Sequence, residues 1–447
     1  MNHCRHRFVS SIATAAAVLL VVAQETAYAQ SAAAVGLADN YTARARGQDA
    51  IIWNPANLAL PDGPAFSVTL LPFRAFAGTT PIDVFDLADA ESGSLTEAQK
   101  RRWLDRIAAT GTEYGMLGAD IAGVSLSWGR VGFMLSSSAS GALTLGSDAA
   151  ELLLYGPRGA NGEPRDFDVE GSSFHAAVTS SVALSYARSV PLRIDAAPFP
   201  DQHASIGVTV RYITGHALFA AFGLGEAASD DLHSDLPLPL IYSDAADGFD
   251  HGAGAAVDLG VAWLAGPLTL GVVLRDALNT FEWDLASLRY RSAAGLLADD
   301  EDDPRSGPMS SAPHAVQVMA RRRLGRLAYP PVLAVGGSLD LPELSLTLDL
   351  RHRFGEGLDL EPATHAGIGA EYRRLPYLPL RAGLAAVSGG YRAAAGVGVE
   401  RGPIAFAIAA ARIRGNLGSY TCLTASFTVL GRPASPRVPH ENGRPAS

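Results

Sequence analysis

The sequence predicts an all-β fold, a transmembrane antiparallel β-barrel of about 14 strands. Three observations lead to this prediction. Apolar and polar residues alternate over most of the chain, the alternating segments are long, and the connections between them are short and long in turn. Together they favour a barrel that crosses a bilayer over a soluble sandwich of two sheets.

Alternation with a period of two runs through the chain from about residue 65 to 430. Residues 344–351 read LSLTLDLR, in which four leucines alternate with two hydroxyls, an Asp and an Arg. Successive side chains of a strand point to opposite faces, so one face is apolar and the other polar. A soluble sandwich and a membrane barrel both alternate in this way, and this pattern alone leaves the two open.

The lengths of the segments and of their connections favour the barrel. Many segments run for about 10 to 15 residues, beyond the ~5–6 of a typical soluble strand and enough to cross a bilayer at a tilt. Short connections stand at Gly129-Arg130, Gly266-Pro267, 341–343 and Gly402-Pro403, whereas long polar ones cover about 78–112, 146–171, 221–249 and 277–329. Short periplasmic turns and long external loops are typical of outer-membrane barrels.

The predicted strands form an even number, which returns the chain to its starting side. They are 64–77, 113–128, 131–145, 172–189, 203–220, 250–264, 267–276, 330–340, 344–353, 365–374, 380–387, 391–400, 404–413 and 418–430. Two further segments, 281–292 and 314–323, compete for strand status and would give 16. Charge interrupts both, so we assign them to a large external loop and place the barrel at 64–430.

The two ends of the chain are predicted to lie outside the barrel. Residues 1–29 have a basic start, an apolar stretch and an Ala27-Tyr28-Ala29 pattern, which is typical of a cleaved secretory signal. Residues 431–447 are rich in Pro, Arg and Gly and are expected to form a disordered periplasmic tail. The mature chain would retain only Cys422, which excludes an intramolecular disulfide. We expect the protein in the cell outer membrane.

The segment before the first strand, residues 30–63, has an apolar wedge and a rigid turn. Ile51, Ile52 and Trp53 precede Asn54-Pro55-Ala56. Non-helical backbone at membrane depth needs surroundings made of protein, so we expect this segment to fill the lumen as a plug. Trp53 would then be buried against inward-facing glycines such as Gly367, Gly369, Gly396 and Gly398. A plain entry turn into the first strand is the alternative.

Residues 34–60, AVGLADNYTARARGQDAIIWNPANLAL, resemble the N-terminal signature of FadL-type outer-membrane transporters for hydrophobic compounds. The matching positions are Gly36, Tyr41, Thr42, Ala43, Trp53, Asn54, Pro55, Ala56, Leu58 and Ala59. The chain departs from the signature at Asn57, where Gly is usual, and at Arg44 and Arg46. Residues 371–384 and 396–411 resemble the closing strands of related exported barrels more weakly. The resemblance implies about 14 strands and a lumen filled by the N-terminal segment, with Trp53, Asn54, Pro55 and Ala56 as the plug or gate.

A set of charged residues is predicted to face the lumen. By alternation these are Arg211, Asp258, Arg275, Asp349, Arg351, Glu371, Arg373, Arg381, Arg392 and Glu400. They could line a pathway for a substrate or ion, or they could form salt bridges between the barrel wall and the plug. Both signs are mixed, whereas a selective pore shows rings of one sign, so the pattern favours salt bridges.

The external loops carry features with two interpretations each. Trp103, Phe219, Phe222, Phe281 and Trp283 could form an apolar pocket or pack the loops together. The best helix is 94–108, with Ser94 and Glu97 as a capping box, and its Lys100, Arg101, Arg102 and Arg106 could contact lipid phosphate or face solvent. The acidic run 299–303 could bind calcium or simply be solvated.

Other classes of function have little support. The net charge of −10 argues against a nucleic-acid binder. The chain has no P-loop, nucleophile elbow or H-E-x-x-H, and its histidines lack ligand spacing, so we expect no enzyme, cofactor or metal. We expect a monomer that contacts outer-membrane lipid and moves a hydrophobic small molecule, a fatty acid or an aromatic hydrocarbon, inward. The alternative is a structural or secretion-associated barrel that binds partner proteins and transports nothing.

Overall fold

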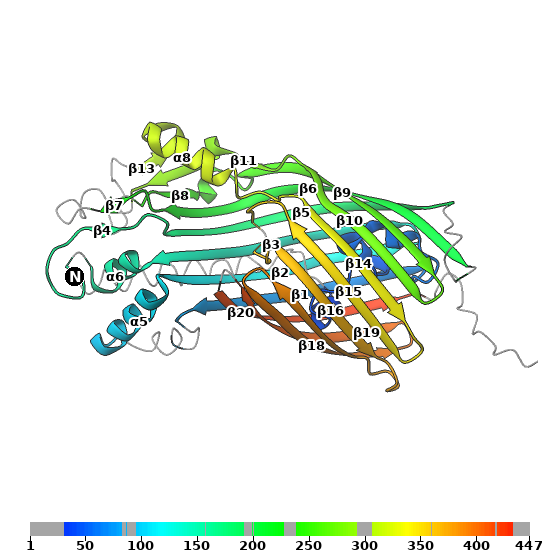
Figure 1. Cartoon of the computed structure of the whole chain (residues 1–447). Helices are drawn as coiled ribbons and strands as arrows, with labels where there is room; N and C mark the ends of the chain where they lie inside the picture. The colour runs from blue at the N-terminus through cyan, green and yellow to red at the C-terminus, as the bar shows by residue number, and fades with distance from the viewer. Residues whose placement is uncertain are drawn as a thin grey trace, which may run out of the picture.

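The computed structural model describes residues 31–82, 86, 95–156, 158–191, 199, 201–227, 238–292, 306–358, 360–415 and 418–431. The expected signal at 1–29, the tail beyond 431 and the acidic run 299–303 lie outside these residues. The described part forms a tilted antiparallel barrel with helices and short strands at one end (Figure 1). None of its helices is both long and apolar enough to span a membrane.

Within the described residues, fourteen long strands form the wall. They are β1 (Phe66–Thr80), β2 (Thr112–Trp128), β3 (Val131–Gly146), β5 (Ser173–Val190), β6 (Gln202–Phe222), β9 (Gly252–Ala265), β10 (Leu268–Asn279), β14 (Val332–Asp340), β15 (Leu344–Arg353), β16 (Thr364–Tyr372), β17 (Leu380–Val387), β18 (Gly390–Arg401), β19 (Ile404–Gly415) and β20 (Gly418–Leu430). Each pairs antiparallel with its neighbours in this order, and β1 pairs with β20. The prediction of a closed 14-stranded barrel is confirmed.

The two segments that competed for strand status lie in the external loop, as predicted. Residues 281–292 form only the short strands β11 (Glu282–Trp283) and β12 (Leu288–Arg291), and 314–323 falls in helix α8 (His314–Leu324). The remaining small elements are β4 (Phe167–Asp168), β7 (Glu226–Ala227), β8 (Leu240–Ser243), β13 (Ser306–Pro308), and the 3-10 turns η3 (Ala245–Asp247), η4 (Leu285–Ser287) and η5 (Met309–Ser311).

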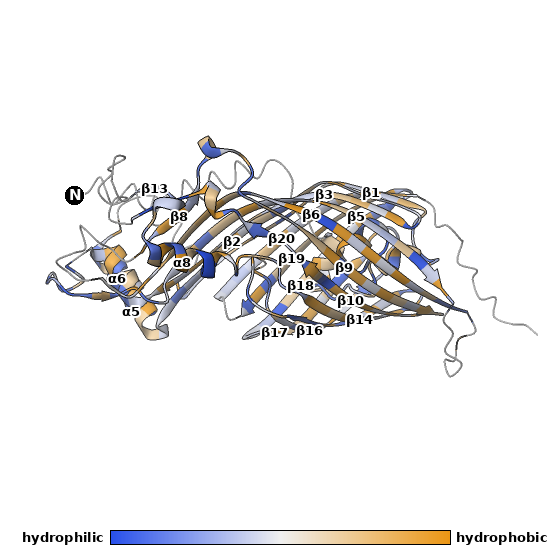
Figure 2. Cartoon of the chain, turned by 90° about the horizontal axis from the view of Figure 1, so that it is seen from above, coloured by the Kyte–Doolittle hydropathy of each residue, from blue (hydrophilic) through white to orange (hydrophobic). Residues whose placement is uncertain are grey.

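The two faces of the wall differ as the alternation predicts. On β15, Leu346, Leu348 and Leu350 are exposed on the outside, while the intervening Thr347 and Asp349 are buried inside. Hydrophobic and hydrophilic residues alternate along the strands in the same way (Figure 2). The apolar face therefore points away from the lumen, as a lipid-facing surface requires.

Four strand pairings of the described wall contain a register shift, and two of these bulges border the lumenal site. The pairing of β1 with β20 shifts register between Leu70 and Phe73, where Pro72 cannot donate a ladder hydrogen bond. The pairing of β10 with β9 shifts between Leu274 and Leu278, and Asp276 in this bulge has a positive φ of 51°. Each bulge changes which side chains face inward, and both border the lumenal site described below.

The external end of the barrel is uneven. Strands β2, β3, β5 and β6 extend far toward this end, where α5 (Glu97–Thr110) and α6 (Ser147–Tyr155) lie, whereas β16 and β17 are short (Figure 1). The connection 388–389 between β17 and β18 is also short although it lies on the external side. The external ends of β17 and β18 are therefore not covered by a long loop of their own.

Helix α5 is capped differently from the prediction. Its capping box consists of Thr96 and Gln99, and the helix runs from Glu97 to Thr110. The predicted start at Ser94 with Glu97 was wrong, because a second, overlapping box two residues later is the one used. Gly111, with a φ of 80°, ends the helix in the left-handed conformation that glycine favours.

Candidate functional site: a plugged lumen and its chamber

The N-terminal segment lies inside the barrel. It forms α2 (Ala32–Gly36), η1 (Gly47–Asp49), α3 (Ala50–Trp53) and η2 (Pro55–Ala59), and most residues from 31 to 60 are buried, with the others half-buried. The Ser31 hydroxyl accepts the amide of Ala34 at the start of α2, and Asn54 caps η2 ahead of Pro55. We refer to residues 31–60 as the plug.

Inward-facing glycines of the wall contact the backbone of the plug. A Cβ at Gly383 would overlap the backbone of Leu37, and one at Gly207 would overlap the backbone of Ala56. Only a residue without a side chain allows so close an approach. The glycines where an added Cβ would meet backbone or side-chain atoms of the plug come from eight strands and are Gly132, Gly207, Gly260, Gly271, Gly336, Gly367, Gly369, Gly383 and Gly396.

Trp53 is buried in the lumen, but against other plug residues. It packs with Ala34, Leu37 and Ala45, its ring meets that of Tyr41 edge to face at 5.8 Å, and the Arg351 guanidinium lies over it at 5.8 Å. The prediction that glycines 367, 369, 396 and 398 would receive the indole was wrong. The first three receive plug residues 36–40, and Gly398 lies beside Arg381.

The Asn54-Pro55-Ala56 turn is fixed to β6 and β9. Asn54 accepts the amide of Ala56 at 3.1 Å and donates to the Val261 carbonyl of β9 at 3.0 Å. Ser205 on β6 donates to the Ala56 carbonyl at 2.8 Å. These hydrogen bonds therefore attach the C-terminal part of the plug to the wall at β6 and β9.

Charged groups hold the plug on the other side. Asp349 of β15 accepts the amides of Tyr41 at 2.5 Å and Thr42 at 2.9 Å. Arg392 of β18 forms an ion pair with Asp39 of the plug. Arg44 of the plug pairs with Asp340 at 2.5 Å and with Glu371 at 2.6 Å.

The remaining predicted lumenal charges pair within the wall. Arg381 meets Glu371 at 2.7 Å and Glu400 at 3.4 Å, and Arg373 meets Asp340 at 3.4 Å. Glu400 and Arg373 are partly exposed, because they lie near the periplasmic mouth. The structure therefore joins most of the predicted charges into pairs between wall and plug or between neighbouring strands.

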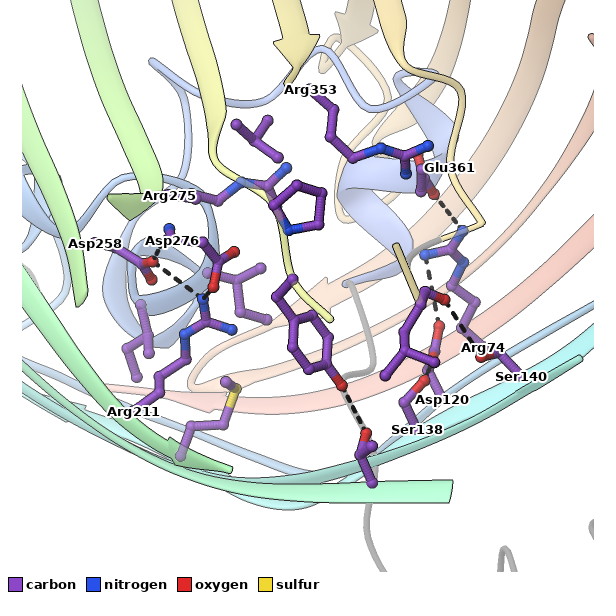
Figure 3. Close-up of a pocket in the computed structure, with 18 of the residues that line it drawn as sticks. Arg74, Asp120, Ser138, Ser140, Arg211, Asp258, Arg275, Asp276, Arg353 and Glu361 are labelled. Carbon is purple, nitrogen blue, oxygen red and sulfur yellow. Dashed lines mark hydrogen bonds and ion pairs between the residues drawn. The ribbon is translucent and has the colours of Figure 1, made fainter. Parts of the chain in front are cut away.

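A chamber of about 130 Å³ lies between the plug and the external segments (Figure 3). Its apolar surface comes from Ile51 and Ile52 of the plug, Met134 and Ala177 of the wall, and Leu358 of the β15–β16 connection. Tyr329 and Pro330 contribute from the segment before β14. The chamber therefore has apolar contributions from the plug, the wall and the external loops.

Two ion clusters flank this chamber on opposite sides (Figure 3). In one, Arg211 pairs with Asp258 at 3.1 Å and with Asp276 at 2.5 Å. In the other, Arg74 pairs with Asp120 at 3.5 Å and with Glu361. Arg351 also forms an ion pair with Glu361, at 3.3 Å. Arg275 and Arg353 line the chamber as well, so five arginines and four carboxylates surround it.

Four residues of the two ion clusters were not predicted from the sequence: Arg74, Asp120, Asp276 and Glu361. The bulge at Pro72 shifts the alternation of β1 and turns Arg74 inward, and the β10 bulge does the same for Asp276. Glu361 lies in a connection that folds into the lumen. Pro72 inside an apparent strand is the signal that marks the first bulge.

The loop aromatics pack the external segments together. Phe281 and Trp283 meet edge to face at 5.4 Å, Trp283 donates to the Leu327 carbonyl at 2.9 Å, and Phe222 belongs to the same buried cluster. Phe219 meets Phe174, and Trp103 packs near Ile82 and Ile107. None of these five aromatic residues lines the chamber.

The described residues contain no group of three His, Cys, Asp or Glu side chains arranged to hold a metal ion. Cys422 is buried in the lumen, where Arg74 lies beside it.

The closed barrel, apolar outside and filled inside, is that of an outer-membrane β-barrel protein. The chain belongs to the family described as "F plasmid transfer operon, TraF, protein", whose model matches residues 52–288, more than half of the 447. No curated protein matches it.

Similar solved structures include a FadL homologue of Pseudomonas aeruginosa, with 12% identity, 90% of this chain and 99% of that chain covered, and a TM-score of 0.44. The toluene transporter TbuX of Ralstonia pickettii has 13% identity, covers 90% of this chain and 98% of its own, and gives a TM-score of 0.47. The first is of the FadL type that residues 34–60 resemble.

Proposed function

We propose that the protein is a plug-gated outer-membrane barrel that binds a small hydrophobic molecule with one acidic group in the chamber and passes it inward. It acts as a monomer, without cofactor or catalysis. The observation that carries the proposal is the composition of the chamber, where apolar side chains of plug, wall and loops meet and arginines stand at the edges.

The size of the chamber limits the class of ligand. Its volume of about 130 Å³ is close to the ~150 Å³ of an apolar cavity that takes up benzene. A single ring or a short acyl chain therefore fits, and a longer chain requires the plug to move. The surplus of arginines over carboxylates favours a carboxylate on the ligand, because guanidinium groups bind carboxylates through paired hydrogen bonds.

The chamber is coupled to the plug through its floor. Ile51 and Ile52 line the chamber and directly precede the Trp53-Asn54-Pro55-Ala56 segment that we expect to act as the gate. A ligand that enlarges the chamber would press on α3 and on the turn held by Asn54. The bulges of β1 and β10, which bring Arg74 and Asp276 to the chamber, supply the kinked strands that a transporter of this kind would need.

Binding to the purified full-length chain tests the proposal. Titration calorimetry with benzoate, and with toluene as its uncharged counterpart, should show saturable binding of benzoate and weaker binding of toluene. Ala177→Phe fills the chamber and should abolish benzoate binding. Ala386→Phe, the same change on the exposed outer face of β17, should leave it unchanged. Heat-modifiable gel migration checks that both variants are folded.

A second candidate is a structural barrel that holds partner proteins and transports nothing. The ion pairs between plug and wall favour it, since Arg392–Asp39 and Arg44–Glu371 lock the lumen. The family name, taken from a transfer operon, is compatible with such a role. The absence of saturable binding by wild-type protein, or binding unaffected by Ala177→Phe, would support this candidate instead.

A further inference from the structure

Arg412 and Arg414, at the external end of β19, lie on the lipid-facing side of the wall. The outward side chains of β19 are, in order, Ile404, Phe406, Ile408 and Ala410, followed by Arg412 and Arg414 at the external end. The inward neighbours Ala411 and Ile413 are buried, so the direction of both arginines is unambiguous. An apolar stripe that ends in two cations indicates a specific position relative to the bilayer.

The depth of these arginines follows from the strand geometry. Eight residue steps separate Ile404, beside the periplasmic turn, from Arg412, and ten separate it from Arg414. With a rise of about 3.3 Å per residue and a tilt of about 40°, these steps span roughly 20 and 25 Å of bilayer. The apolar band of such barrels is about 25 Å tall, so both guanidinium groups lie at its outer edge, where lipid phosphates begin.

The neighbouring strands complete a polar patch. Arg414 is paired in register with Tyr391 of β18 and Ser419 of β20, and Arg412 with Ala393 and Thr421. Arg412 donates to the Thr421 hydroxyl at 2.8 Å. No ion pair joins either guanidinium to a carboxylate in the described part of the chain, whereas the inward Arg392 nearby is paired with Asp39.

The rows below this patch are apolar. The next row toward the periplasm consists of Ala395, Ala410 and Leu423, and rows with Ile408, Phe406 and Phe427 follow. Small side chains directly beneath the arginines leave room for acyl chains against the wall. Tyr391, Arg412, Arg414 and Thr421 are all exposed, so the patch is accessible from outside.

We propose that the external end of β18–β20 binds a phosphate group of the phosphorylated outer-leaflet lipid, with its acyl chains on the apolar rows below. Arg412 and Arg414 would hold the phosphate through charge-assisted hydrogen bonds, and the hydroxyls of Tyr391, Ser419 and Thr421 would assist. A free phosphate ion would use only the patch and none of the apolar surface. The basic residues of α5 are less suited, since Lys100 pairs with Glu97 and Arg106 with Asp86.

The test uses the full-length, delipidated chain in mild detergent and native mass spectrometry with lipid A. Arg412→Glu combined with Arg414→Glu should lower the affinity by more than about 30-fold, since loss of each basic residue near an anionic surface contributes roughly a factor of five and the added carboxylates repel the phosphate. The matched control is Arg188→Glu with Arg401→Glu, which changes two exposed arginines at the periplasmic end and should bind like wild type. Arg412→Gln with Arg414→Gln repeats the measurement if the acidic variant does not fold.

Chemically dephosphorylated lipid A should bind weakly to the wild type, and millimolar inorganic phosphate should compete poorly. Equal binding of lipid A and its dephosphorylated form would overturn the proposal. So would unchanged binding in both arginine variants, or a loss as large in the periplasmic control. Efficient competition by inorganic phosphate would indicate a simple anion site and would also overturn it.

Discussion

At the scale of single residues, the wall glycines decide how closely the plug can approach. Gly383 of β17 faces inward, and a side chain there would overlap the backbone of Leu37. Gly337 of β14 is also in the wall, yet a Cβ there would meet only Leu270 at 3.5 Å, an ordinary contact. The two glycines therefore differ in function although both lie within strands.

We expect Gly383→Ala to destabilise the plugged state, because overpacking of this kind typically costs about 1–3 kcal/mol. The plug must shift away from β17, so planar-bilayer conductance should rise while the barrel still inserts. Gly337→Ala should match wild type in both conductance and thermal stability. Unchanged conductance in Gly383→Ala would contradict the close approach of Leu37.

The direction of single side chains could be predicted from the sequence at some positions and not at others. Alternation placed Asp349, Arg392 and Glu371 on the lumenal side, because a period of two leaves little choice once the lipid face is known. The inward direction of Arg74 and Asp276 was not predicted, because each lies at or beyond a bulge that reverses the alternation of its strand. Trp53 was placed in the lumen, but its neighbours depend on how the plug folds on itself, which no local pattern reveals.

At the scale of elements, the strands close the barrel by pairing with one another, and the plug fills the lumen that they enclose. Every wall strand pairs with two others without help from the plug. The plug in turn supplies partners for Asp349, Arg392 and Glu371. Removing it leaves the strand pairing intact, and the released charges would face water.

Deletion of residues 31–60 should therefore give a barrel that inserts but conducts freely. We expect a marked rise in single-channel conductance and a lower melting temperature than that of wild type, because contacts with the wall glycines and ion pairs are lost. The Gly337→Ala protein serves as the folded, closed reference. A deletion protein with wild-type conductance would mean that the external loops, and not the plug, close the lumen.

Helix α5 shows why element boundaries are hard to predict. Ser94-x-x-Glu97 and Thr96-x-x-Gln99 are two overlapping capping boxes, and both satisfy the same local rule. The structure uses the second, and local sequence gives no reason to prefer it. The ends of several strands were easier to predict, because they lie at turns that contain Gly129, Gly266 and Gly402, each with a positive φ.

At the scale of the whole molecule, the outer face gives the test of membrane placement. Leu348 lies near the middle of β15, with its side chain exposed on the outside, and His352 lies on the same face near the external end. Changing either residue to Arg places the same charge on the same strand at two depths. In a bilayer the cost depends on depth, whereas on a water-exposed sheet both positions would be equivalent.

We expect Leu348→Arg to lower the free energy of unfolding by about 2–4 kcal/mol, and His352→Arg by about 0–1 kcal/mol, the ranges for the midplane and the interface of a barrel. Urea titrations of protein inserted in vesicles, followed by tryptophan fluorescence, measure both. The edge contact of His352 with Phe354, at 4.7 Å between ring centres, is a small additional loss in the second variant. Equal costs in the two variants would show that β15 does not cross a bilayer, because depth alone distinguishes them.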